Sequence, residues 1–360
     1  MKELRSLDWM LMLTGCKIIQ TCRCVSVLNN ILFFLVVSIE LFLSLGFAVQ
    51  ASNIPDMLNI YIITMYIPHY VYGIVFLVAM RVNQHAQYQY LKRVIARTSF
   101  HRRKSLERTS LIYTIIVIAC TAPITASYLY LTITFHEAYP EMVLEICLFY
   151  LDVFVTLLGR WVLMSCLYCS YMMKATSHFE QTFMDQLHVM IKDQTVSVTE
   201  VLIKIHRVSL LKKRCTSLMG IIPCLPVVYL FFAISGLILQ VKRVGFDLDT
   251  STEAVIMIGY FICLIYTTYV SDQSRQEAVK KADDVTLVLL SSGREDLRQV
   301  MEPLQTLASI EHQPCRLFTM NYHFIISYLS AFITFTVLLT QILHEVTIEK
   351  EMAHHNTSKS

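Results

Sequence analysis

Long apolar runs separated by charged and polar segments dominate the chain. Seven of these runs are long enough to cross a bilayer, because a hydrocarbon core of about 30 Å takes about 20 helical residues. They lie roughly at residues 31–50, 57–80, 110–134, 142–167, 217–240, 253–272 and 324–343. Lipid offers the backbone no hydrogen-bond partners, and the alternating pattern of a membrane barrel is absent. The pattern therefore predicts an all-α polytopic membrane protein with seven transmembrane helices.

Two polar segments between the spans also show helical periodicity. Apolar residues recur at helical spacing in two consecutive runs: Phe179, Phe183, Leu187, Met190 and Ile191, then Val198, Val201, Leu202, Ile205, Val208 and Leu211. A weaker pattern precedes the last span at Leu287, Leu290, Leu297, Val300 and Leu304. These runs predict long cytosolic helices, which either simply extend the spans or pack together into a subunit-assembly domain.

The composition agrees with a membrane protein and excludes other classes. Apolar residues make up 55% of the 360 residues and charged residues only 16%, against about a quarter in soluble domains. The mean hydropathy is +0.53, which is too apolar for two soluble domains. A net charge of +3 is too small to indicate nucleic-acid binding.

The distribution of Lys and Arg predicts the topology. The N-terminus and the segments after spans 2, 4 and 6 carry 25 of the 30 Lys and Arg residues, while the opposite side carries four. Positive residues stay in the cytosol, so we expect a cytoplasmic N-terminus and an extracellular C-terminus. The one glycosylation sequon, at Asn356, then lies in the extracellular tail. No cleavable signal peptide is recognisable, so the first span is expected to act as the targeting signal.

No catalytic or metal-binding motif is present. The sequence lacks G-x-S-x-G, H-E-x-x-H, P-loop and G-x-G-x-x-G patterns. We therefore expect no enzymatic activity, no cofactor and no metal site. The extracellular loops are about six, seven and twelve residues long, so any ligand site must lie among the helices.

Polar and aromatic residues within the spans are the candidates for that ligand site. Glu40, His69 and Asp152 lie inside spans. An ionisable side chain is costly there, so each is expected to have a partner or a function. An apolar pocket with a few convergent polar groups is what a small-molecule site requires. The candidate ligand-binding residues are Tyr66, Tyr128, Tyr150, Asp152 and Tyr260. The alternative is that these tyrosines are interfacial anchors and that Asp152 makes hydrogen bonds between helices.

The last span carries a pattern that a pore helix would need. Thr334, Leu338, Gln341 and Glu345 share one helical face, and Glu349 and Glu351 follow at its outer end. Apolar rings gate pores by dewetting, and acidic rings favour cations. The alternative is an ordinary span with a polar exit.

The C-terminal sixty residues resemble the signature of insect gustatory receptors. The resemblance rests on the stretch from Cys315 to His323 and on Thr334-Phe-Thr-Val-Leu-Leu-Thr-Gln341, where that signature has Thr-Tyr, five mostly apolar residues and Gln. Phe335 replaces the tyrosine. The architectural resemblance covers the whole chain, and the residue-level resemblance covers about 315–342.

The resemblance implies a mechanism. Gustatory receptors are similar to insect odorant receptors, and both are tetrameric ligand-gated cation channels whose last spans surround a central pore. The ligand pocket is expected among spans 2 to 6, and cytosolic helices near span 7 are expected to anchor the tetramer. Gln341 and Ile342 fall where the family has its pore constriction. Thr336 occupies a place that is often acidic in sugar-sensing members, which favours a bitter or unassigned tastant.

The resemblance also divides the chain by role. It implies a cytoplasmic segment at 1–30, spans 1–6 with the pocket at 31–272, cytosolic anchor helices at 273–323, a pore-lining helix at 324–343 and an extracellular tail at 344–360. We expect a taste receptor in the plasma membrane of chemosensory neurons. Its expected partners are a small-molecule tastant, membrane lipids and related subunits in a homo- or hetero-tetramer. A G-protein-coupled receptor and a small-molecule transporter remain as alternatives.

Overall fold

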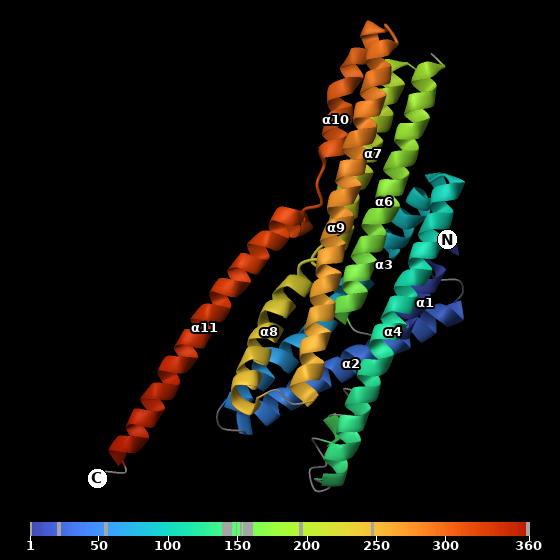
Figure 1. Cartoon of the computed structure of the whole chain (residues 1–360). Helices are drawn as coiled ribbons and strands as arrows, with labels where there is room; N and C mark the ends of the chain where they lie inside the picture. The colour runs from blue at the N-terminus through green and yellow to red at the C-terminus, as the bar shows by residue number, and fades with distance from the viewer. Residues whose placement is uncertain are drawn as a thin grey trace.

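The structure is a computed structural model that describes residues 2–19, 23–53, 57–138, 146–148, 150, 151, 153, 161–193, 197–245 and 248–357. Within these ranges all regular elements are helices. The fold is thus all-α, as the apolar runs predict. Figure 1 shows most of the helices gathered in one elongated bundle.

The N-terminal half contains two short helices and three long ones. The short helices are η1 (Lys2–Leu4) and α1 (Arg5–Leu13). The long helices are α2 (Arg23–Asn53), α3 (Met57–Arg97) and α4 (Phe100–Ala138). A helix of 41 residues such as α3 is about 60 Å long, so it extends well beyond a bilayer core of about 30 Å.

The C-terminal half begins with α6 (Trp161–Lys192), α7 (Val198–Met219) and α8 (Leu225–Val244). It continues with α9 (Leu248–Ser291), η2 (Glu295–Val300), α10 (Met301–Ser309) and η3 (Pro314–Arg316). The last helix is α11 (Tyr322–Thr357). Figure 1 shows α11 diverging from the bundle as it runs toward the C-terminus.

Several described helices have the length and composition of membrane spans. Three stretches fulfil both criteria: Cys24–Val49, Phe100–Thr134 and Glu253–Ser291. Leu225–Val241 and Tyr322–Leu338 are shorter apolar helices. These five stretches coincide with spans 1, 3, 5, 6 and 7 of the sequence prediction. The second span lies within α3. Of the fourth, at 142–167, residues 142–145, 149, 152 and 154–160 lie outside the described residues.

The periodic segments between the spans form helices that pack together. Phe179, Phe183, Leu187 and Ile191 on α6 are buried, and so are Val201, Ile205 and Val208 on α7. Figure 1 shows α6, α7, α9 and α10 side by side at one end of the molecule. These segments therefore pack together within the subunit, and their role in assembling subunits stays a prediction.

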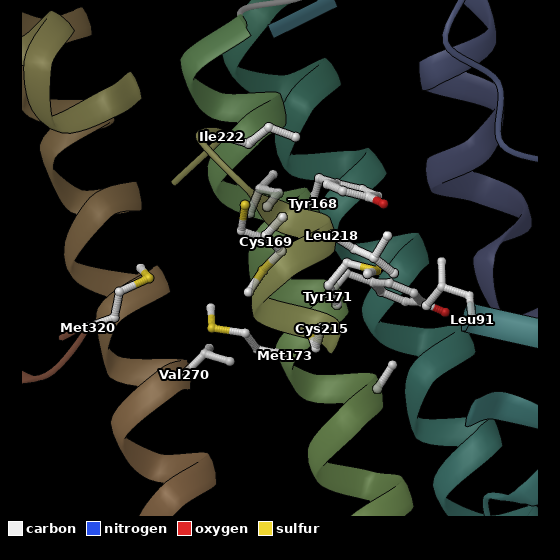
Figure 2. Packing of buried hydrophobic residues seen from close by; sticks show 14 of the residues in the cluster. Leu91, Tyr168, Cys169, Tyr171, Met173, Cys215, Leu218, Ile222, Val270 and Met320 are labelled. Atoms are coloured by element: carbon white, nitrogen blue, oxygen red, sulfur yellow. The ribbon is translucent and has the colours of Figure 1, made fainter. Parts of the chain in front are cut away.

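The buried core is densest where α6 meets its neighbours. Tyr168, Cys169 and Met173 of α6 are fully buried, as is Cys215 of α7. Figure 2 shows these side chains together with Leu91, Leu218, Val270 and Met320. This core connects the membrane-spanning part to the end where α7 and α10 lie.

The helix α1 is docked on the bundle by its apolar face. Leu4, Leu7 and Leu11 are fully buried. The backbone N–H of Leu7 donates to Oγ of Ser110 on α4 at 3.0 Å. Oδ1 of Asp8 accepts from the backbone N–H of Ile18 at 2.6 Å and of Ile19 at 2.9 Å, which fixes the turn after α1.

Candidate functional site

Aromatic side chains of α2 and α3 meet inside the membrane-spanning bundle. Tyr66 of α3 stacks on Phe47 of α2 with ring centroids 4.8 Å apart. Phe47 also stacks on Tyr70 at 5.6 Å, and Tyr70 contacts the ring of His69 at 5.5 Å. Offset and edge-on ring pairs of this kind stabilise one another beyond their buried area.

The same group of rings continues into α8 and α9. Tyr229 of α8 lies 5.6 Å from His69 and 5.6 Å from Tyr72 of α3. Tyr229 also contacts Tyr260 of α9 at 6.2 Å. We call these residues the aromatic cluster: Phe47, Tyr66, His69, Tyr70, Tyr72, Tyr229 and Tyr260. The cluster joins α2, α3, α8 and α9 through flat apolar ring faces that also carry hydroxyl and imidazole groups.

The structure places two of the predicted ligand residues at opposite ends of the aromatic cluster, where Tyr66 contacts Phe47 and Tyr260 contacts Tyr229. Tyr66 and Tyr260 belong to the same aromatic cluster. Tyr150 is 40% exposed. Tyr128 lies on α4, but its side chain and the whole of Asp152 lie outside the described residues.

Sequence reasoning missed most of the cluster. Phe47, Tyr70 and Tyr229 are buried aromatic residues in apolar spans, and nothing in a single span distinguishes them from ordinary core residues. His69 was visible as an ionisable residue within span 2. The only further signal was that spans 2, 5 and 6 all contain tyrosines at similar depth.

A layer of polar side chains lies beside the aromatic cluster and provides a hydrogen-bond partner for the buried carboxyl of Glu40. Glu40 of α2 is fully buried, and its Oε1 accepts a hydrogen bond from Nε1 of Trp161 on α6. A charge at the bilayer centre costs about 2.5–3.5 kcal/mol on insertion scales, so such a partner is needed. Gly73 of α3 allows the contact, because a Cβ there would lie 2.6 Å from Nε1 of Trp161. The hydroxyl of Tyr72 hydrogen-bonds that of Ser165 in the same layer.

The last helix, α11, has two different faces. One face packs on the bundle: the ring of Phe335 lies 4.4 Å from that of Phe231 on α8, and the hydroxyl of Tyr328 donates to the carbonyl of Val227 at 3.2 Å. Phe335 therefore packs on its neighbour at the place where the gustatory signature has tyrosine. The other face is exposed and carries Ser327, Thr334 and Gln341, each seven residues from the next.

The predicted pore residues lie on this exposed face where they are described. Thr334 and Gln341 are exposed, and Leu338 is 52% exposed. Oγ1 of Thr334 donates to the carbonyl of Ser330 at 2.9 Å. Ile342 and Glu345 belong to α11, but their side chains are outside the described part of the structure. The same holds for Asn356 of the sequon. We call the exposed residues Ser327, Ser330, Thr334, Leu338 and Gln341 the polar stripe of α11.

A buried polar junction connects the helices at the other end of the molecule to the start of α11. Nζ of Lys212 on α7 lies 3.0 Å from Oε2 of Glu180 on α6. Lys212 also donates to the carbonyls of Leu307 and Ala308 on α10, at 3.3 and 3.5 Å. Burial raises the pKa of the Glu180 carboxyl, and the charge of Lys212 opposes that rise.

His312 continues the junction into the loop before α11. Its Nδ1 lies 3.2 Å from Oγ1 of Thr216 on α7, and its carbonyl accepts from the backbone N–H of Met320 at 3.0 Å. Burial, assisted by the positive charge of Lys212, lowers the pKa of His312 to about 3. The imidazole is therefore neutral at physiological pH. The junction thus links α7 to the loop that leads into α11.

A cavity of about 660 Å³ lies between the end of α7 and the loop at 310–315. Lys213, Gly220, Glu311 and Cys315 are among its lining residues. None of its lining residues belongs to the aromatic cluster. Among the described residues, no group of three His, Cys, Asp or Glu is placed to hold a metal ion.

Comparison with known proteins identifies the fold. No protein-family profile and no curated protein sequence matches the chain. The structure is similar to the insect olfactory receptor OR5 from Machilis hrabei in complex with eugenol, with a TM-score of 0.72, 10% identity, and coverage of 94% of this chain and 97% of that one. A second structure of the same receptor gives a TM-score of 0.70 at 12% identity with the same coverage. The chain therefore has the fold of an insect olfactory receptor.

Proposed function

We propose that the chain is a chemoreceptor subunit of a ligand-gated, non-selective cation channel. The observation that carries the proposal is the fold likeness to an olfactory receptor over 94% of this chain. The exposed polar stripe of α11 adds support, because hydroxyl and amide groups on a membrane helix favour a water-filled lumen over lipid.

The ligand site of this receptor lies in and around the aromatic cluster. The receptor OR5 is described in complex with eugenol, a small aromatic molecule. Tyr66 and Tyr260 lie within the cluster, and we assign Tyr128, Tyr150 and Asp152 to the same pocket region. The ligand is a small, mostly apolar organic molecule with at least one hydrogen-bonding group.

The pore is formed by α11 helices from several subunits. Ser327, Thr334 and Gln341 recur every seven residues, which keeps them on nearly one face of a straight helix. Gln341 and Ile342 form the constriction, with Thr334 and Leu338 on one side and Glu345 on the other. The carboxylate of Glu345 attracts cations to the outer mouth.

The channel is a homo- or hetero-tetramer with related subunits. At the end of the bundle that the charge pattern predicts to be cytosolic, several large apolar side chains are exposed, namely Val189, Ile203, Leu210, Leu287, Leu290 and Leu317. An exposed apolar surface of this kind indicates a protein interface when no lipid is available to cover it. We assign residues 273–323, which include Leu287, Leu290 and Leu317, to the anchor of the tetramer, and α6 and α7 add Val189, Ile203 and Leu210 beside it.

The sensory modality is taste, and a bitter or unassigned tastant is favoured over sugar. This part of the proposal rests on the gustatory signature around Thr334 and Gln341 and on Thr336 at the position that is often acidic in sugar-sensing members. The site of action is the plasma membrane of chemosensory neurons.

Current recording tests the channel against the two alternatives. Cells that express the chain, alone and with related subunits, are exposed to a panel of small organic compounds that includes eugenol. If the chain is a channel, we expect an agonist-evoked cation current at constant voltage. G-protein inhibitors should not abolish this current. Saturable substrate uptake without ion current favours a transporter, and current that G-protein inhibitors abolish favours a G-protein-coupled receptor.

The topology has a separate test that needs no agonist. An epitope tag after the C-terminus is stained on intact cells, and glycosidase treatment reports on Asn356. Surface staining supports the extracellular C-terminus. Staining only after permeabilisation, in cells where the protein reaches the surface, overturns the topology and the channel proposal with it.

A further inference from the structure

The exposed face of the N-terminal helix combines cations with membrane-seeking side chains. Lys2, Arg5, Trp9 and Leu13 are all exposed and follow one another at helical spacing of three and four residues. Trp9 is 51% exposed. Trp and Leu beside Lys and Arg on one face are typical of a helix that lies at a membrane surface.

The start of α4 presents the same combination beside it. Lys104, Arg108, Leu111, Ile115 and Ile118 recur every three or four residues and are all exposed. The apolar members lie within the candidate membrane span Phe100–Thr134. The two cations precede Leu111, Ile115 and Ile118 on this face of α4, so they sit at the N-terminal end of an exposed apolar stripe.

A cavity of about 400 Å³ lies between these two faces. Its lining residues include the four cations Lys2, Arg5, Lys104 and Arg108, together with Ser6 and one acidic residue, Glu107. No ion pair or hydrogen bond of the four cationic side chains is observed within the described part of the chain. The lining carries four positive charges against one negative charge.

The cavity is held open by contacts on the buried side of α1. The Leu7 N–H to Ser110 Oγ hydrogen bond joins α1 to α4. The hydroxyl of Tyr171 on α6 donates to the carbonyl of Glu3 at 2.9 Å. Because Leu4, Leu7 and Leu11 are fully buried, the cations are presented on a fixed surface and lose little freedom when an anion binds.

We propose that this cavity binds the phosphate-bearing headgroup of an anionic phospholipid. Charge complementarity selects a phosphate group, and Arg5 and Arg108 are suited to bind it through paired N–H donors. The neighbouring stripe of Leu111, Ile115 and Ile118 leads away from the cations and accommodates the acyl chains. The charge pattern predicts that this end of the molecule faces the cytosol, where the leaflet carries anionic lipids.

A soluble phosphate compound shares the headgroup chemistry, so the test separates the two sources. Full-length protein in detergent is titrated with dioctanoyl phosphatidylinositol 4,5-bisphosphate, dioctanoyl phosphatidylcholine and inositol 1,4,5-trisphosphate. We expect the anionic lipid to bind more tightly than the zwitterionic lipid and more tightly than the free headgroup. Equal affinity for the two lipids overturns the site, and equal or tighter binding of the trisphosphate overturns the assignment to a lipid.

Variants locate the binding within the molecule. Each Lys or Arg near an anionic lipid contributes about 1 kcal/mol, so Arg5→Gln with Arg108→Gln should weaken binding roughly 30-fold. The matched control is Arg93→Gln with Arg97→Gln, two exposed arginines on α3 that should leave affinity unchanged. If the first pair fails to fold, Lys2→Gln with Lys104→Gln serves in its place. Equal weakening by the control pair shows nonspecific attraction and overturns the site.

Discussion

Glu180 and Lys212 form an ion pair that is almost completely buried, with side-chain exposures of 2% and 5%. The pair joins α6 to α7, and the same ammonium group holds the carbonyls of Leu307 and Ala308 on α10. Both charges are removed from water, so each depends on the other for compensation. This dependence makes the junction a fixed connection between the membrane-spanning helices and the segment that leads into α11.

Removing one partner of this pair should destabilise the protein strongly. Lys212→Met leaves the Glu180 carboxylate buried without its cation, which costs about 3–5 kcal/mol. Denaturant or thermal unfolding of the detergent-solubilised protein measures the change. The matched control is Lys204→Met, which removes an exposed ion pair with Glu200 and should cost less than about 1 kcal/mol.

A double variant separates the charge from the packing. Lys212→Met with Glu180→Leu replaces both charges by apolar side chains and should recover much of the lost stability. If the double variant is as unstable as Lys212→Met alone, the hydrogen bonds to α10 matter more than the charge pair.

Acid should weaken the junction through His312. The pKa of His312 is lowered to about 3 in the folded state from an ordinary value of about 6.5. At pH values between these two, the imidazole is protonated in the unfolded chain but neutral in the folded protein. The stability from the neutral imidazole is present above about pH 6.5 and is lost as the pH falls, by about 1.4 kcal/mol at pH 5.5. His312→Gln should reduce this pH dependence of unfolding.

The control for that experiment is His206→Gln, because His206 is exposed on α7. Asp8 contributes with the opposite sign: burial raises its pKa to about 6, so its contribution is lost as the pH rises from about 4 toward 6. The comparison is therefore made between variant and wild type at each pH. An unchanged pH slope in His312→Gln contradicts the neutral, buried assignment.

The aromatic cluster should control agonist potency. Tyr229→Leu removes the ring that contacts His69, Tyr72 and Tyr260 while keeping an apolar side chain. An aromatic contact contributes about 0.5–1.5 kcal/mol beyond its area, so the half-maximal agonist concentration should rise roughly two- to tenfold. Dose–response curves of evoked current measure this shift. The matched control is Tyr269→Leu, because Tyr269 on α9 is 42% exposed and is not a member of the aromatic cluster. Equal shifts in the two variants would mean that the cluster is not the centre of the site.

Charges on the exposed apolar surface should disrupt assembly. Leu287 and Leu290 on α9 are 65% and 53% exposed, so Leu287→Glu with Leu290→Glu leaves the subunit's own core intact. Native mass spectrometry should show fewer tetramers and more monomers. The matched control is Val82→Glu, because Val82 on α3 is 77% exposed but lies outside the proposed anchor. Tetramers of the wild-type abundance in the double variant would place the interface elsewhere.

The periodicity of apolar residues predicts the helices well, but it does not predict which helices pack against one another. The apolar runs and the patterns at Phe179–Ile191 and Val198–Leu211 gave α6 and α7, since a repeated apolar face must be buried in any fold. The docking of α1 was missed. The topology prediction uses only the cations of this segment, although Leu4, Leu7 and Leu11 recur at helical spacing and form an apolar face.

The candidate sites depend on contacts between distant segments, and a single sequence does not contain them. Glu180 and Lys212 are 32 residues apart, and Glu40 and Trp161 are 121 residues apart. Each of these two carboxylates has many possible partners in the sequence, and only the tertiary arrangement of the helices selects one. The polar stripe of α11 is different, because the spacing of Thr334 and Gln341 on one helix fixes their shared face without any tertiary information.

Single-channel recording of Gln341→Leu tests the central claim that α11 lines a cation pore. The account predicts altered conductance or gating with normal surface expression, because an amide at the constriction is replaced by an apolar side chain. The control is Thr336→Val, since Thr336 is less exposed than Thr334 and lies on the other side of the helix, and it should conduct as wild type does. Unchanged currents in Gln341→Leu would contradict the pore assignment.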